Sequence, residues 1–119
     1  MKNWLIPLAV ILPLAAAPVA MAASSRLGNM ASFEAIASDT LVLVDKGEMK
    51  AAEKRITDFE TAWDKAESML YPKDKAAWST IDDAADAAIS SLRAGSPDAV
   101  AAQRTVSALI DTLKDPSAQ

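Results

Sequence analysis

Cysteine and histidine are both absent from this 119-residue sequence. Without cysteine the chain forms no disulfide, so its stability must come from an apolar core. Without histidine it has no histidine general base, no histidine-ligated haem and no typical zinc site. These absences exclude Ser-His-Asp and Cys-His catalysis, and no Gly-rich phosphate loop is present. We therefore expect a protein that is not an enzyme.

The first 22 residues have the pattern of an export signal. Lys2 supplies a positive charge, residues 4–20 are uncharged and apolar, and Ala20-Met21-Ala22 offers small residues at both positions that a signal peptidase reads. We expect cleavage after Ala22, which leaves no stable membrane anchor. The alternative is an uncleaved anchor, because the apolar stretch is long enough to span a bilayer, although three prolines interrupt it.

The mature chain is small and acidic. Removing residues 1–22 leaves 97 residues, enough for one domain, and changes the net charge from −4 to −5 because Lys2 is lost. A negative surface argues against nucleic acid and anionic lipid as partners, and it permits cations, basic peptides or basic protein faces. The lack of cysteine and of glycosylation sequons, together with the short alanine-rich signal, indicates the bacterial periplasm. We expect a monomer or a homodimer there.

Four segments of the mature chain have the spacing of amphipathic helices. Alanine is abundant, glycine is scarce, and apolar residues recur every three or four positions. The predicted helices are residues 29–45, 48–70, 74–94 and 97–114, and the last three carry a heptad stripe. We expect Asn29 and Asp74 to cap the first and third helices, Gly47 to end the first helix or cap the second, and Ser96 with Pro97 to begin the fourth.

The connections between these helices are only a few residues long, so sequential helices must be antiparallel neighbours. This predicts an all-α protein with an up-down-up-down four-helix bundle. The alternative is a three-helix core with a loosely docked first helix. The predicted organisation is a signal peptide (1–22), a flexible leader (23–28), a helical bundle domain (29–115) and a tail (116–119).

The mature chain resembles a set of small exported all-α bacterial proteins of unassigned function. The resemblance lies in residues 59–67, Pro72, Trp78 and the Ile81-Asp82 pair, and consists of two tryptophans with flanking acids on consecutive helices. It implies export and a helical fold, and it implies no reaction.

Five acidic residues of the second and third helices are candidate metal ligands. They are Glu60, Asp64, Glu67, Asp82 and Asp86, which occupy e and b positions of the heptads, and we call them the carboxylate seam. They converge along one groove if the e flanks of the two helices meet, rather than the g flanks. Carboxylate oxygens are the ligands that calcium, magnesium and manganese prefer. The alternative is an ordinary solvated acidic face that pairs with Lys65 and Lys75.

Three aromatic residues near the turn between the same two helices are candidate ligand or partner contacts: Trp63, Tyr71 and Trp78. The alternative is that the tryptophans fill the core, with an indole N–H reaching a polar neighbour. Val42, Leu43, Val100 and Ile110 fall off the apolar stripes and are expected to form an exposed patch.

These observations favour a non-enzymatic module that binds an envelope protein or peptide through a helix face. The alternative function is a periplasmic cation or small-ligand binding protein that uses the carboxylate seam, with a divalent cation as its only cofactor. An enzyme with paired catalytic carboxylates is disfavoured, because a small bundle with short loops offers little room for a cleft.

Overall fold

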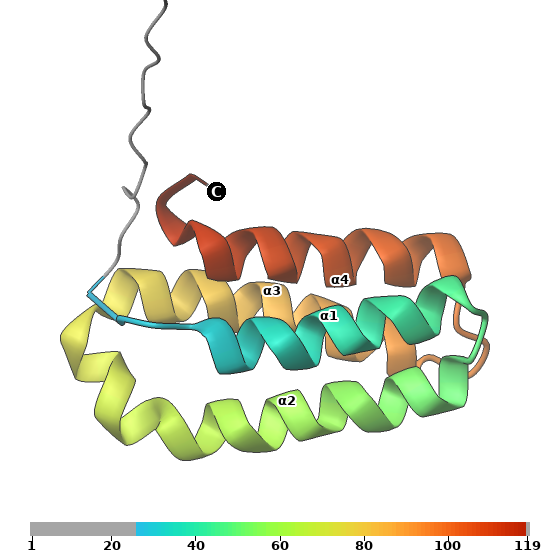
Figure 1. Ribbon diagram of the computed structural model, residues 1–119, viewed down its shortest axis with the longest axis horizontal. Coiled ribbons are helices and arrows are strands. Elements are labelled where there is room, and N and C mark those ends of the chain that lie inside the picture. Colours follow the sequence, from blue (N-terminus) through green and yellow to red (C-terminus); the bar gives the residue numbers. More distant parts are fainter. Residues whose placement is uncertain (1–25, 119) are drawn as a thin grey trace, which may run out of the picture.

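The chain folds into four antiparallel helices, and the computed structural model describes residues 26–118 (Figure 1). The helices are α1 (Ala31–Asp45), α2 (Met49–Leu70), α3 (Lys75–Arg93) and α4 (Ala99–Lys114), with 3-10 turns η1 (Tyr71–Lys73) and η2 (Pro116–Ala118). Each helix packs against the next, and α4 returns to pack against α1. The predicted all-α four-helix bundle is therefore confirmed. The predicted signal peptide and its cleavage site lie outside the described residues.

Helix α1 is an integral part of this bundle. It packs on both α2 and α4, and Ala37, Thr40 and Val44 are buried there. Phe33 on α1 also makes ring contacts with aromatic side chains of α2. The alternative of a loosely docked first helix is therefore wrong.

The packed domain extends past the predicted range 29–115 at both ends. Leu27 lies in the segment expected to be a flexible leader, yet its side chain is buried in the core. Pro116 lies in the expected tail and is also buried, and it begins η2, which packs against α3 and α4. Across residues 26–118, none of the helices is both long and apolar enough to cross a bilayer.

The heptad stripes of α2, α3 and α4 face the core as predicted. Their buried members are Ala52, Ile56, Phe59, Trp63 and Leu70 on α2, Trp78, Ile81, Ala85, Ala88 and Leu92 on α3, and Ala102, Val106, Leu109 and Leu113 on α4. Ala66 is half-buried and Ala99 is exposed. Burial of this continuous apolar surface is the main term that stabilises the fold, because the chain has no disulfide.

The largest side chains of the core lie at one end of the bundle. At the η1 end the rings of Phe33, Phe59, Trp63 and Trp78 pack against one another. Toward the opposite end, α2, α3 and α4 each contribute an alanine with no exposed surface: Ala52, Ala88 and Ala102. Val44, Ile56 and Leu92 are also buried toward that end. The core is therefore aromatic at one end and made of smaller aliphatic side chains at the other.

The turn between α1 and α2 is closed by Gly47, as predicted. Its φ is +78°, a backbone conformation that favours glycine. The Gly47 N–H donates to the carbonyl of Val44 at 2.9 Å, and the Glu48 N–H donates to the carbonyl of Leu43 at 2.9 Å. This pair of bonds is a Schellman motif, which satisfies two carbonyls at the end of α1.

Asp74 begins α3 as predicted, since its Oδ1 accepts the backbone N–H of Ala77 at 3.0 Å. The same carboxylate accepts the N–H of Arg26 at 3.3 Å, which fastens the segment before α1 to this end of the bundle. The prediction that Asn29 caps α1 is wrong, because the helix begins at Ala31 and its N-cap residue is Met30, whose side chain makes no capping bond. The Oδ1 of Asn29 accepts the Ala31 N–H at 2.7 Å in the turn before the helix.

The prediction for the start of α4 is wrong by two residues. Ser96 and Pro97 were expected to cap and begin this helix, whereas it begins at Ala99 with Asp98 as the cap. The Oδ1 of Asp98 accepts the N–H of Val100 at 3.1 Å. A carboxylate caps at least as well as a hydroxyl, and its negative charge also interacts favourably with the helix dipole.

Candidate functional site

Trp63 and Trp78 lie in the core and not at a binding surface. Their rings are stacked, with centroids 3.8 Å apart and planes inclined by 5°. Trp63 is 1% exposed and Trp78 is 4% exposed. The structure therefore supports the core-filling interpretation for these two of the three candidate aromatic residues.

The polar neighbour of the buried indole is Asp82. The Trp63 Nε1–H on α2 donates to Oδ1 of Asp82 on α3 at 3.1 Å. A buried indole N–H needs such an acceptor, because leaving it unpaired away from water costs free energy. Asp82 is consequently drawn into the interface between α2 and α3, where it is half-buried.

The e flanks of α2 and α3 do meet, which is the condition that convergence of the carboxylate seam required. Besides the Trp63–Asp82 bond, Arg93 at the end of α3 reaches α2 and donates to Glu60 Oε1 at 2.6 Å and to Thr57 Oγ1 at 3.1 Å. Glu60 is thus neutralised by an arginine. The five acids therefore do not form one set of equivalent ligands.

Three aspartates of α3 cluster beside the buried indole. One carboxylate oxygen each of Asp82, Asp83 and Asp86 lies within 4.8 Å of the others. Sequence reasoning missed Asp83, although its position next to Asp82 and three residues before Asp86 was a usable signal. Desolvation raises the pKa of Asp82, the charge of Asp86 raises it further, and the Trp63 hydrogen bond opposes the shift. The charges of Asp83 and Asp64 also raise this pKa.

The raised pKa of Asp82 predicts that this residue's contribution to stability falls as the pH rises. An acid whose pKa is higher in the folded than in the unfolded state binds its proton more readily when folded, so its contribution is greatest at low pH. It disappears as the pH rises from the ordinary value of 3.8 through the folded-state pKa. We expect Asp82→Asn to raise the free energy of unfolding near pH 7 and to flatten its pH dependence, because the amide oxygen still accepts from Trp63.

This prediction is checked by urea unfolding followed by circular dichroism at pH values between 4 and 7. Asp111→Asn on the exposed side of α4 is the matched control, because it removes one charge outside the interface. An Asp82→Asn protein with the pH slope of the wild type would contradict the assignment.

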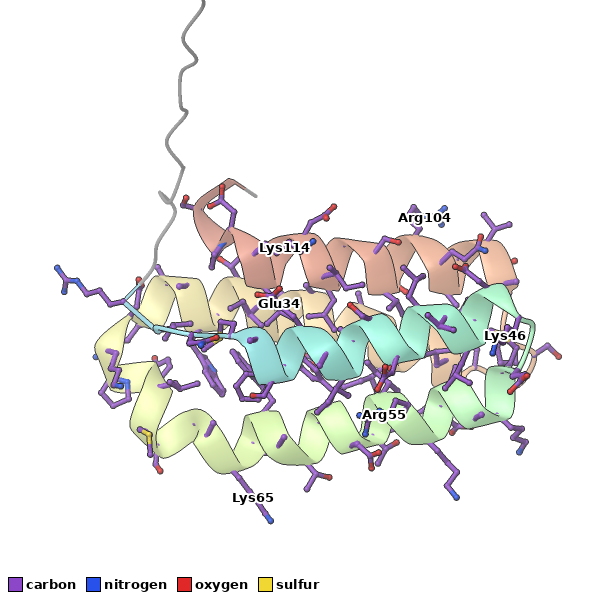
Figure 2. All side chains as sticks on the ribbon, in the orientation of Figure 1. Glu34, Lys46, Arg55, Lys65, Arg104 and Lys114 are labelled. Atoms are coloured by element: carbon purple, nitrogen blue, oxygen red, sulfur yellow. The ribbon has the colours of Figure 1, made fainter. Side chains whose placement is uncertain are left out.

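Neither lysine expected to neutralise the acids does so. Lys65 points from α2 away from the other helices (Figure 2), and the Lys75 Nζ lies 5.7 Å from the ring centroid of Tyr71. Within the described part of the chain, ion pairs involve only Arg55 and Arg93 as cations. The alternative of acids paired with Lys65 and Lys75 is therefore not what the structure shows.

Tyr71 is the accessible member of the aromatic set, and it is 38% exposed. It lines an open groove of about 340 Å³ at the junction of α2 and η1, which we call the Tyr71 groove. The lining residues are Asp64, Glu67, Ser68, Tyr71 and Pro72. Met69 lies between them in the sequence and is 66% exposed. The groove thus brings together members of both predicted sets, two carboxylates and one aromatic ring.

A larger depression of about 660 Å³ lies over the first half of α2, but its charges are mixed. Lys50 and Lys54 line it together with Glu53 and Asp58. Opposite charges in equal number give no net preference for a charged ligand. The Tyr71 groove, in contrast, has two carboxylates and no basic residue in its lining.

The exposed apolar patch predicted from residues off the stripes does not form. Leu43 packs against the core and Ile110 is buried, whereas Val42 and Val100 are exposed. The apolar faces of α1 and α4 are therefore wider than a heptad stripe, which is usual for helices that pack against two neighbours.

No protein-family model, curated protein or solved structure matches this chain.

Proposed function

We propose that this chain is an exported, non-enzymatic protein of the bacterial periplasm that binds a partner protein or peptide. The observation that carries the proposal is the Tyr71 groove, which the exposed Tyr71 lines together with Asp64 and Glu67. Met69, adjacent in sequence to the groove residue Ser68, is also exposed. Exposed aromatic and methionine side chains are typical of interaction surfaces. The export signal pattern of residues 1–22 supports the periplasmic location.

Binding fits the groove better than catalysis does. Every residue that lines it is exposed, whereas acid/base catalysis by two carboxylates depends on a pocket that excludes water. The absence of histidine and cysteine from the sequence removes the commonest general base and the most reactive nucleophile.

Site-specific photo-crosslinking in the periplasm tests this function. A photoreactive residue at Ser68, which lines the groove and is exposed, is expected to give a discrete adduct that Tyr71→Ala abolishes. Arg104, which points outward from α4 (Figure 2), is the control position and is expected to give none. The same adducts from both positions, or no adduct from Ser68, would contradict the proposal. Recovery of a protein that retains residues 1–22 would contradict cleavage after Ala22 and indicate a membrane-anchored protein.

A second candidate function is the binding of a divalent cation by Asp82, Asp83 and Asp86. Calcium binds oxygen at about 2.3–2.6 Å, so two ligand oxygens of one ion lie at most about 5 Å apart. The 4.8 Å limit on the three carboxylate oxygens is compatible with that requirement. Three protein ligands are few against the roughly 6–8 that calcium takes. Water must supply the rest, so the binding is weak.

Calorimetric titration with calcium tests this candidate. The expected dissociation constant is roughly 0.1–1 mM, the range of weak extracellular sites. The double variant Asp83→Asn/Asp86→Asn is expected to lose binding, and Glu34→Gln on α1 is expected to keep it. If no saturable binding occurs below about 1 mM, the candidate is eliminated.

A further inference from the structure

We propose that the Tyr71 groove recognises a basic segment of its partner, through a lysine or arginine side chain. Its charged head lies between Asp64 and Glu67, and its alkyl stem lies on Tyr71 and Pro72. This inference rests on the proposed function and names the chemistry of the partner.

The two carboxylates of the groove are not held in ion pairs. Asp64 and Glu67 are three residues apart on α2 and therefore project from the same side of the helix. No ion pair within residues 26–118 includes either of them. The arginines that do form ion pairs, Arg55 and Arg93, are engaged by other acids. A complementary ligand must bring its own positive charge.

The negative field extends from the groove across to α3. The charge of Asp64 acts on Asp82, and Asp82 clusters with Asp83 and Asp86. An extended acidic surface attracts a segment with several basic residues more strongly than a single cation, since each additional charge adds to the attraction. This extent favours a basic peptide segment over a small monovalent ligand.

The apolar part of the groove matches the stem of a basic side chain. Lysine and arginine bury their methylene groups on apolar surfaces while the charged head stays in water, and Tyr71 with Pro72 provides such a surface. An aromatic ring also attracts a cation placed over its face. The Tyr71 ring already has the ammonium of Lys75 at 5.7 Å. Lys75 therefore competes with a partner cation.

Titration of mature protein, residues 23–119, with a synthetic 12-residue peptide of alternating lysine and serine tests the proposal. Amide NMR shifts are expected to change in the second half of α2 and in η1. Binding is expected to weaken at least tenfold between 25 and 300 mM salt, because the Debye length shortens. A glutamate–serine peptide of equal length is expected not to bind. Lys75→Ala is expected to tighten binding two- to fivefold.

Matched variants separate specific recognition from general attraction. Asp64→Asn/Glu67→Gln is expected to weaken peptide binding at least fivefold. Glu34→Gln/Asp111→Asn removes the same charge from α1 and α4 and is expected to change it less than twofold. Tyr71→Ala is expected to weaken binding, whereas Tyr71→Phe keeps it. All these side chains are half-buried or exposed, and circular dichroism verifies folding.

Equal weakening by the two double variants would overturn the proposal, because the peptide would then respond only to net charge. Failure of the lysine peptide to bind, while Ser68 still gives its adduct in the periplasm, would overturn the basic-partner inference and leave the proposed function standing. Loss of both signals would overturn both. Shift changes confined to the first half of α2 would also overturn the proposal, since they would place the site at the other depression.

Discussion

Replacing Trp63 with alanine is expected to lower the free energy of unfolding by about 3–5 kcal/mol, the usual cost of truncating a buried aromatic side chain. Trp63 contacts rings from three helices: Phe33 on α1, Phe59 on its own helix and Trp78 on α3. The replacement opens a cavity at the level where the core side chains are largest. It also removes the indole N–H that donates a hydrogen bond to Asp82. Chemical unfolding followed by far-ultraviolet circular dichroism measures the loss.

Two further variants make this prediction decisive. Trp63→Phe keeps a ring in the stack but removes the N–H, so it is expected to cost less than the alanine variant and to remain folded if the latter does not. Met69→Ala truncates a large apolar side chain on the same helix that is 66% exposed, and we expect a change within about 0.5 kcal/mol. Similar losses for Trp63→Ala and Met69→Ala would contradict the central position of Trp63 in the core.

The fold was predictable because apolar periodicity is a local property that every helix of this chain displays. The alternation of three- and four-residue steps placed the buried stripes of α2, α3 and α4, and Asp74 and Gly47 marked two helix ends. The start of α4 was predicted wrongly because Ser96 and Asp98 are both good caps, and spacing alone does not decide between them. The burial of Leu27 was not predicted because a single apolar residue ahead of a helix belongs to no periodic pattern that would indicate it.

The candidate site was less predictable because it depends on contacts between helices. The heptad pattern indicated that the Trp63 indole is buried, and a buried indole N–H needs a polar neighbour. Only the register of α2 against α3 identifies Asp82 as that neighbour. The same register places Arg93 against Glu60, so Glu60 is held in an ion pair and is not a free ligand of the carboxylate seam.

The Tyr71 groove had a sequence signal that was not used. One helix face carries four of its lining residues, spaced by three or four positions: Asp64, Glu67, Ser68 and Tyr71. This spacing indicates that the acids and the ring share one side of the helix.

Replacing Ala88 with leucine is expected to destabilise the protein by about 1–3 kcal/mol, through overpacking instead of cavity formation. Ala88 has no exposed surface, and Ala52 and Ala102 are equally enclosed on α2 and α4. The three added carbon atoms must displace a neighbouring helix, because protein interiors are close-packed and leave no room for them. The measurement is again chemical unfolding, with near-ultraviolet circular dichroism to follow the stacked tryptophans.

The matched control for Ala88→Leu is Ala87→Leu, one residue earlier on α3 but exposed, where the same side chain is expected to change stability by less than about 0.5 kcal/mol. Because Ala88 and the stacked rings of Trp63 and Trp78 lie toward opposite ends of the bundle, Ala88→Leu is also expected to leave the near-ultraviolet signal of the folded protein largely unchanged. Stabilisation by Ala88→Leu would reveal unfilled space between the helices. A lost tryptophan signal would show that the two ends are packed as one unit, in which case a change in the core at either end would also reach the Tyr71 groove.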